Sequence, residues 1–528
     1  EIVLVTGVQT CALPISVPGA PTVLPFHTFT CPLSAKDIRM ISERNAMRIS
    51  CAALRAPWLP QTVYPPPPPP SPTLNIGYIS SDFNNHPLAH LMQSVFGMHD
   101  PRKAKAICYA TTSSDNSVHR QQIEKEAPVF RDTSGWPSDR LVQQIVKDEV
   151  HILVNLNGYT RGAKNEVFAA RPAPIQMSFM GFAGTLGAEW CDYLLADETA
   201  IPQSTLRPWR RNIDLDDQLR CDESVDDEDW VYSENIIFCR DTFFCCDHRQ
   251  SSEDRQLPWV GEQERRWKMR KELFPDLPDD VIILGNFNQL YKVCNTSIHD
   301  ETNTNKYLQI EPTTFRTWLR ILANVPKAVL WLLRFPDLGE SNLRRTARLW
   351  AGEEVASRIL FTDVAPKNLH ISRARICDLF LDTPECNAHT TAADILWSST
   401  PLLTLPRYEY KMCSRMAASI LKGALPRSDE GKQAASELIA TDEEQYEEFA
   451  VKLASGLRYD EQGVGSGRLS ELRRLLYENR CHSALFDTKR WVLDLERAYS
   501  EAWLRWVEGT GGRHLFVRRD LIFRVCGG

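Results

Sequence analysis

The chain lacks the markers of several common protein classes. Its 15 cysteines include no CxxC pair, so neither a zinc ribbon nor a thioredoxin-like redox site is indicated. Free thiols in a reducing compartment are the simplest account of these cysteines. No apolar run approaches the roughly 20 residues that a membrane-spanning helix needs. The net charge of −7 and the scattered basic residues argue against a nucleic-acid-binding protein.

Residues 1–16 have no initiator Met, no basic region and no clear cleavage site, so they do not indicate a signal peptide. We interpret residues 1–16 as a translated sequencing adapter and exclude them from fold reasoning. The whole sequence has 528 residues, 43% hydrophobic and 24% charged, which is typical of a globular protein. This length predicts two large domains with appendages.

The residues before the first domain form an N-terminal extension, 1–73. We expect a helix at 35–56, capped by Ser34, because Ile38, Ile41 and Ile49 supply apolar positions. Six consecutive prolines at 65–70, followed by Ser71 and Pro72, predict a stiff, solvated polyproline linker. A ligand for a proline-reading module is the alternative reading of this run.

Two blocks of alternating strand and helix patterns follow. The first spans 74–202 and the second 281–435, separated by an acidic connector at 203–280 and followed by a helical tail at 436–528. Such alternation indicates right-handed crossovers and mostly parallel, doubly wound sheets. The predicted fold class is α/β, with the two domains facing a cleft along the carboxyl ends of their strands.

The expected strands and helices are short and regularly spaced. Strands are predicted at 74–80, 106–110, 150–156, 175–180 and 193–196, and then at 282–287, 329–335, 358–362, 379–381 and 402–405. Helices are predicted at 88–98, 138–148, 165–170, 313–323, 343–357, 370–376, from Thr391 onward, and at 414–421.

The stretch from Cys386 to Trp397 is the part of the second block that most resembles a binding site. A buried strand is followed by a polar turn, and Thr390 and Thr391 stand where a helix begins, as capping residues. Free N–H groups and the helix dipole there favour an anion, with His389 as a further donor. Asp394, one turn inside, is an acceptor suited to a ribose. A Thr at a helix start is also ordinary capping, so this turn alone does not establish a site.

Basic and polar residues follow two other strands of the same block. Gln289 and Lys292 come after its first strand, and Lys367, His370 and Arg373 come after another. A single lysine after a strand is usually just a solvated charge. Several basic loops at successive strand ends of one sheet instead predict a shared phosphate site near Thr390.

The first block carries histidines and a glycine-rich turn at its own strand ends. His86 precedes Pro87, the expected first helical residue, and His151 begins the strand that leads to Asn155. The turn at 180–187 contains three glycines, where backbone can approach a ligand closely. A lone histidine is more often structural than functional, but His86 would face the phosphate cluster across the cleft.

A metal site is not predicted. Asp214-Leu215-Asp216 matches the DxD pattern of some metal-dependent glycosyltransferases, but it lies in the charge-rich connector with no preceding strand. We interpret it as a chance match.

Taken together, residues 74–200 and 281–425 resemble the catalytic region of the eukaryotic protein O-linked N-acetylglucosamine transferase family. The matching motifs are long and occur in the same order: Gly77–Phe83, His86-Pro87, His90–Ser94, His151–Asn155, Arg171–Gln176, Phe287–Lys292, Val329–Pro336, Val364–Lys367 and His389–Thr391.

The resemblance implies a GT-B fold of two Rossmann-like domains and a helical tail. It further implies inverting, metal-independent transfer of N-acetylglucosamine from UDP-N-acetylglucosamine to Ser/Thr hydroxyls of nuclear and cytoplasmic proteins, with no cofactor and no nucleic-acid or membrane partner. His86 would accept the hydroxyl proton, and His151 would help to bind substrate. UDP would be held by Gln289, Lys292, Ala365, Lys367, His370, Arg373, His389, Thr390, Thr391 and Asp394.

The sequence departs from the family pattern at three places. The tetratricopeptide repeats that precede the catalytic region are absent, and a short acidic connector replaces the large insert of the animal enzymes. Residues 293–309 separate Lys292 from Ile310, which adjoin in the family; this polar stretch looks like a translated intron. We expect it to form a disordered loop that lowers activity. A catalytically impaired UDP-binding scaffold, or a GT-B enzyme with a small-molecule acceptor, are therefore alternatives.

Overall fold

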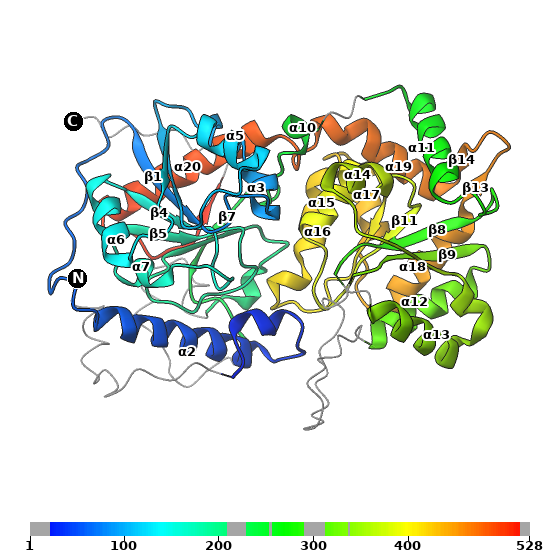
Figure 1. Cartoon of the computed structure of the whole chain (residues 1–528), viewed down its shortest axis with the longest axis horizontal. Coiled ribbons are helices and arrows are strands. Elements are labelled where there is room, and N and C mark those ends of the chain that lie inside the picture. Colours follow the sequence, from blue (N-terminus) through cyan, green and yellow to red (C-terminus); the bar gives the residue numbers. More distant parts are fainter. Residues whose placement is uncertain (1–21, 208–228, 253–255, 290–311, 336–337, 518–528) are drawn as a thin grey trace.

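The computed structural model describes residues 22–207, 229–252, 256–289, 312–335 and 338–517. Two lobes lie side by side, each built on its own parallel sheet (Figure 1). The predictions for 1–16, Asp214, Asp216, Lys292 and the 293–309 insert fall outside the described residues. In the described part of the chain, no helix is long and apolar enough to cross a membrane.

The N-terminal lobe contains an eight-stranded sheet in the order β15-β7-β6-β5-β4-β1-β2-β3, parallel throughout. Its strands are β1 (Leu74–Ser80), β2 (Ala104–Ala110), β3 (Val129–Asp132), β4 (Ile152–Asn155), β5 (Ile175–Ser178), β6 (Tyr193–Ala196), β7 (Asn235–Phe238) and β15 (Leu515–Phe516). Helices cover both faces, so the central strands are apolar almost without interruption. These helices include α3 (Pro87–Met92), α4 (Val95–Met98), α5 (Val118–Glu126), α6 (Ser138–Lys147) and α7 (Asn165–Ala169).

The C-terminal lobe contains a five-stranded parallel sheet in the order β10-β9-β8-β11-β12. Its strands are β8 (Ile282–Asn286), β9 (Ala328–Leu333), β10 (Ile359–Thr362), β11 (Leu379–Leu381) and β12 (Leu402–Leu403). Its helices are α11 (Trp259–Leu273), α12 (Pro312–Asn324), α13 (Leu338–Ser357), α14 (Lys367–Ala374), α15 (Thr390–Trp397), α16 (Met416–Ala424), α17 (Asp429–Leu438), α18 (Glu443–Gly456) and α19 (Arg468–Asn479).

The connector and the tail are more closely tied to the lobes than their sequences suggest. The connector supplies β7 to the N-terminal sheet, the short helix α10 (His248–Ser251) and α11. The last long helix, α20 (Thr488–Val507), returns to the N-terminal lobe, where Figure 1 shows it behind β1 and β4. There Trp491 stacks on Phe179 at 5.4 Å between ring centroids. Both segments therefore hold the two lobes together.

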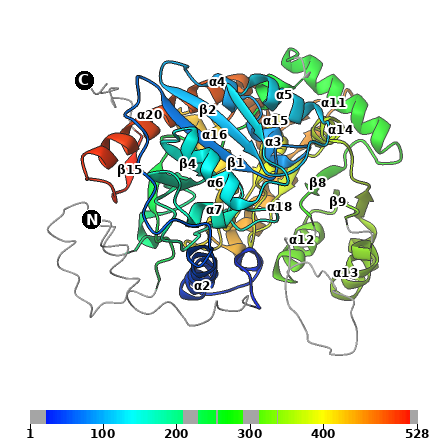
Figure 2. The same ribbon diagram turned by 60° about the vertical axis from the view of Figure 1, so that its left-hand side comes forward.

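The N-terminal extension is also part of the fold. Helix α2 (Ala35–Leu54) begins at Ser34, whose hydroxyl accepts a hydrogen bond from the Asp37 N–H, as the sequence predicts. Helix α2 packs against α7 along one edge of the lobe (Figure 2). Before it, the 3-10 helix η1 (Pro25–Phe29) places Phe29 against Phe182, with ring centroids 4.8 Å apart. This contact brings the extension to the cleft.

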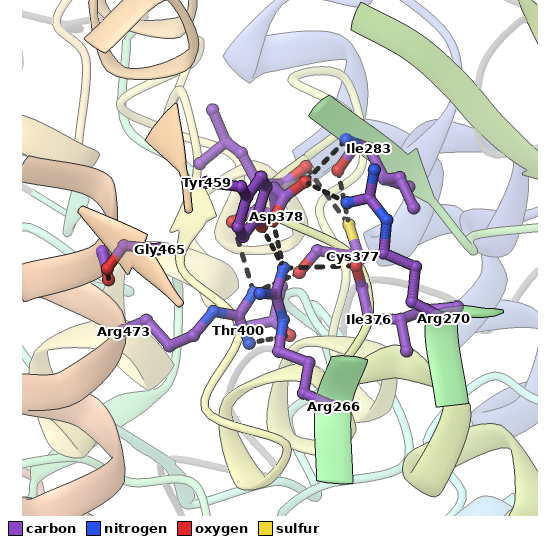
Figure 3. A network of polar contacts seen from close by, with 12 residues as sticks. Arg266, Arg270, Ile283, Ile376, Cys377, Asp378, Thr400, Tyr459, Gly465 and Arg473 are labelled. Atoms are coloured by element: carbon purple, nitrogen blue, oxygen red, sulfur yellow. Dashed lines mark hydrogen bonds and ion pairs between the residues drawn. The ribbon is translucent and has the colours of Figure 1, made fainter. Parts of the chain in front are cut away.

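A buried ionic cluster fixes the connection between α14 and β11. Asp378, directly before β11, faces Arg266, Arg270, Arg473 and the Tyr459 hydroxyl (Figure 3). Burial alone would raise the pKa of Asp378, but the guanidinium groups outweigh it and lower the pKa. The cluster joins α11 and α19 to the strand that leads to the anion-binding turn.

The sequence-based elements agree with the structure in most places. Strands 193–196 and 379–381 are confirmed at their predicted bounds, and helix 88–98 is instead split into α3 and α4. Helix α5 and strand β3 were not predicted, because the segment at 118–132 is mostly polar and its strand lies at the edge of the sheet.

Candidate functional site

A cavity of about 1330 Å³ opens between the two lobes. Loops at the carboxyl ends of both sheets line it, as expected for two doubly wound domains that face each other. The predicted site residues that line the cavity are His86, Gln289, Ala365, His370, His389, Thr390 and Thr391. The structure therefore brings together most of the residues that the sequence singled out.

The turn before α15 forms the C-terminal wall of the cavity. His389 occupies the N-cap position, and Thr390 and Thr391 are the first two residues of the helix, so the prediction that the threonines are the caps is corrected by one residue. No side chain caps this helix, and the His389 Nε2 lies 3.2 Å from the Cys413 carbonyl oxygen. This helix start, with its free N–H groups, and both threonines therefore line the cavity, where they can serve as donors.

Asp394 lies one turn inside α15 but does not line the cavity. Its side chain is buried, and Oδ1 is 2.6 Å from Nε2 of His248 on α10. Burial would raise the pKa of Asp394, but the hydrogen bond and charge of His248, together with nearby Lys367 and His370, outweigh burial and lower the pKa. The predicted ribose acceptor is therefore engaged by a histidine that sequence reasoning missed, because His248 is 146 residues away in the connector.

Lys367 and His370 both lie on α14, but in different surroundings. His370 lines the cavity and packs edge-on against Phe287, with ring centroids 5.7 Å apart. Lys367 does not line the cavity; it lies near the carboxylates of Asp394 and Asp247, and burial lowers its pKa. Lys367 therefore lies near the site, beside these carboxylates and close to His90 and His119 of the other lobe, without lining the cavity.

Arg373 is a support for the cavity wall, since it does not line the cavity in this structure. Its guanidinium donates to the Asp363 carbonyl oxygen at 2.8 Å and lies over the Trp331 ring at 5.8 Å. The next two residues, Val364 and Ala365, line the cavity. We expected Arg373 to reach the turn at Thr390. Instead, it holds the neighbouring loop that contains Asp363.

The loop after β8 forms another part of the cavity wall on the C-terminal lobe. Gln289 is exposed and lines the cavity, as predicted. Asn288 is buried beneath it and donates to the Thr383 hydroxyl at 2.9 Å. This bond joins the ends of β8 and β11, so Gln289 is presented from a fixed turn.

His86 lies on the opposite wall, at the N-cap of α3. Its side chain is 48% exposed, and its Nδ1 accepts a hydrogen bond from the Leu88 N–H at 3.2 Å. A neutral ring that accepts through Nδ1 carries its proton on Nε2, so the nitrogen left for the cavity is a donor. This tautomer argues against the predicted role of His86 as the proton acceptor.

His151 is the predicted site residue that the structure places elsewhere. It precedes β4 at the amino end of the sheet, away from the loops that line the cavity. Its Nδ1 accepts from the Asn75 N–H at 3.0 Å, its Nε2 lies 3.0 Å from the Pro68 carbonyl oxygen, and its ring meets Trp503 edge-on. The expected role in substrate binding is corrected to a structural one, since a histidine before a parallel strand lies at the wrong end of the sheet.

Several cavity residues were not predicted. From the N-terminal lobe these include Asp82, Thr112 and the loop at 159–162, and from the extension Leu24, Phe26 and His27. Buried Asn157 organises this wall, because its amide donates to the Ser81 hydroxyl at 2.8 Å and to Asp82 at 3.0 Å. The polar run after the third predicted strand was a usable signal for the loop. No local pattern indicated the extension.

Gly181 in the glycine-rich turn lines the cavity beside Met180. A Cβ at Gly181 would lie 1.9 Å from the Leu156 carbonyl oxygen, so only glycine fits there. The backbone of this turn is therefore closely approached, but by another loop of the same lobe, whereas we expected a ligand there.

Comparisons with known proteins agree with this architecture. Residues 15–212 and 301–495 match Glycosyl transferase family 41. The chain is 36% identical over 516 residues to the probable UDP-N-acetylglucosamine--peptide N-acetylglucosaminyltransferase SEC of Arabidopsis thaliana, covering 96% of this chain and 46% of that protein. It is 30% identical to the UDP-N-acetylglucosamine--peptide N-acetylglucosaminyltransferase of Caenorhabditis elegans, covering 94% and 46%. The chain thus spans about half the length of these relatives.

The fold has a counterpart among solved structures. A mutant of the Thermobaculum terrenum O-GlcNAc transferase superimposes with a TM-score of 0.67 at 20% identity, covering 91% of this chain and 76% of that one. The likeness confirms the expected GT-B arrangement of two α/β lobes. Since the family match covers both lobes and the relatives align along almost the whole chain, the protein belongs to glycosyl transferase family 41.

Proposed function

We propose that the chain transfers N-acetylglucosamine from UDP-N-acetylglucosamine to Ser/Thr hydroxyls of proteins. The observation that carries the proposal is the cavity in which an uncapped helix N-terminus on one lobe faces His86 and Asp82 on the other. The helix N-terminus would bind a diphosphate, and His86 and Asp82 would contact an incoming hydroxyl. The printed names of the relatives give the same donor and a peptide acceptor.

The donor would bind to the C-terminal lobe. Its diphosphate would accept hydrogen bonds from the N–H groups and hydroxyls of Thr390 and Thr391, with positive charge from Lys292 and Lys367. His370, Gln289 and Ala365 would contact the nucleoside. Arg373 and Asp394 would act indirectly: Arg373 would position the loop at 363–365, and Asp394 would position the start of α15. The two lysines and the donors at Thr390 and Thr391 would neutralise the leaving diphosphate, so we propose metal-independent transfer.

In the reaction, the acceptor oxygen would attack the sugar C1 from the face opposite the diphosphate. The new C1–O bond forms as the bond from C1 to the phosphate oxygen breaks, and the electron pair leaves with UDP, so the anomeric configuration inverts. Nε2 of His86 would donate a hydrogen bond within this site. Asp82 is the one carboxylate among the described residues that line the cavity, and we assign it the hydroxyl proton.

The test is incubation of the purified chain with labelled UDP-N-acetylglucosamine and a Ser/Thr peptide, with and without a chelator. We expect chelator-resistant transfer with an inverted anomeric linkage, and loss of transfer in His86→Ala and Lys292→Ala. Binding of UDP without transfer would instead indicate an impaired scaffold, and transfer to a free metabolite a small-molecule acceptor. We also propose that the chain is located in the cytoplasm and nucleus, which fluorescence microscopy of the tagged chain in cells would test.

A further inference from the structure

The proline run between α2 and β1 has a defined conformation. The peptide bonds before Pro65 to Pro70 are trans. Each ring fixes φ near −65°, and each residue before a proline is kept extended. Six prolines in a row therefore form a left-handed polyproline II helix with three residues per turn.

The exposure of the run follows this period of three. Tyr64, Pro67, Pro70 and Thr73 are partly buried, whereas the two residues between each of them are exposed. One ridge of the polyproline helix thus lies against the N-terminal lobe along its whole length. The run is stiff, as the sequence predicts, but it is a strap docked on the lobe and not a solvated linker.

Side-chain hydrogen bonds hold the strap in place. His151 accepts from the Asn75 N–H through Nδ1, so its proton is on Nε2 and is donated to the Pro68 carbonyl oxygen at 3.0 Å. At the end of the strap, the Thr73 hydroxyl donates to the Pro101 carbonyl oxygen at 3.0 Å. The buried ring of His151 is itself fixed against Trp503, with centroids 4.8 Å apart.

The other two ridges of the strap face outward. Pro65 and Pro68 form one, and Pro66 and Pro69 form the other. In the described part of the chain, Pro68 alone among these prolines has a protein donor on its carbonyl oxygen. A polyproline helix makes no internal hydrogen bonds, so the remaining carbonyl groups are acceptors open to solvent.

We propose that the strap at 65–70 is a docking ligand for a protein domain with an aromatic-lined, polyproline-reading groove. Such grooves receive two proline ridges between their aromatic rings, and two ridges are what the strap leaves free. Because the lobe already holds the helix straight, binding costs little conformational entropy. Residues 56–73 contain no charged side chain, so the partner groove is one that reads uncharged proline, without an acidic pocket for a basic flank.

The test measures binding of purified WW, SH3 and EVH1 domains to the full chain by fluorescence anisotropy, without any sugar donor. Pro66→Ala/Pro69→Ala removes an outward ridge, and Pro67→Ala/Pro70→Ala removes as many prolines from the inward ridge. We expect at least one domain to bind the parent chain. The outward variant should weaken that binding at least tenfold, and the inward variant less than threefold.

Both variants are checked by circular dichroism for an unchanged fold. Equal binding by the parent chain and the outward variant, or no binding by any domain of the panel, would overturn the proposal and leave the strap as a brace. Neither result depends on whether the chain transfers sugar.

Discussion

Nε2 of His248 lies 2.6 Å from Oδ1 of Asp394, and both side chains are buried. The bond joins the connector between the lobes to the helix whose first turn lines the cavity. Asp394 also lies near Lys367 and His370, so its charge organises the basic side of the site. The hydrogen bond therefore fixes α15 relative to both lobes.

Replacing this histidine should affect the donor site. We expect His248→Leu to raise the KM for UDP-N-acetylglucosamine about tenfold, because the buried Asp394 carboxylate would turn toward another donor and disturb α15. Steady-state kinetics measures this change. His248→Gln, which keeps an N–H donor, should recover part of the affinity, and His482→Leu at an exposed histidine should have no effect. An unchanged KM in His248→Leu would remove the link to donor binding.

His86 has two separable roles. His86→Asn keeps an acceptor for the Leu88 N–H but loses the Nε2 donor, so we expect kcat to fall about 10- to 100-fold while stability is retained. His86→Ala should lose the same activity and also about 1 kcal/mol of stability, because the N-cap bond is lost. Urea unfolding and initial rates separate the two effects. Full activity in His86→Asn would show that Nε2 has no part in the reaction.

The cluster around Asp378 should contribute strongly to stability. Asp378→Asn would leave the buried guanidinium groups of Arg266 and Arg270 without their carboxylate, and we expect a loss of about 3 kcal/mol. The control is Asp429→Asn, whose carboxylate is 98% exposed and should change stability by less than about 0.5 kcal/mol. Equal urea midpoints for the two variants would contradict the role of the cluster.

His90 should make the fold sensitive to acid. Burial, with nearby Lys367 and His119, lowers the pKa of His90 to about 3, whereas in the unfolded chain the pKa has its ordinary value of 6.5. As the pH falls below 6.5, the unfolded state gains a proton that the folded state does not bind, so stability decreases. Between pH 7 and pH 5 this costs about 1–2 kcal/mol after allowance for partial exposure.

His90→Asn removes this titration. We expect the difference in unfolding free energy between pH 7 and pH 5 to be smaller in the variant than in the parent chain. His482→Asn, at an exposed histidine, serves as the control and should keep the parent's dependence. The same pH dependence in His90→Asn and the parent would contradict the assignment.

The insert after Lys292 gives a prediction about activity. Deleting 293–309 joins Lys292 to Ile310, and we expect faster sugar transfer because the shorter connection would hold the lysine more firmly beside the diphosphate. A Gly/Ser chain of the same length at 293–309 should stay as slow as the parent, since length separates the two ends. Unchanged turnover in the deletion variant would refute the inhibitory role.

Local sequence patterns were sufficient to predict the two lobes and most of the C-terminal side of the cavity wall. Strands such as β6 and β11 are short, continuously apolar runs bounded by polar turns, and that signal is contained in neighbouring residues. The carboxyl ends of parallel strands meet at one edge, so loops that follow different strands could be grouped correctly before their distances were known. His389, Thr390 and Gln289 were placed in this way.

The sequence by itself determined the alternation of strands and helices, and with it the two sheets and the edge at which ligands bind. Only the tertiary structure decided which polar groups meet across the chain: Asp394 with His248, Asp378 with its arginines, and His151 with the proline strap. These contacts join residues up to 146 positions apart. They depend on how whole helices and strands pack. A sequence pattern does not give the distances between packed elements.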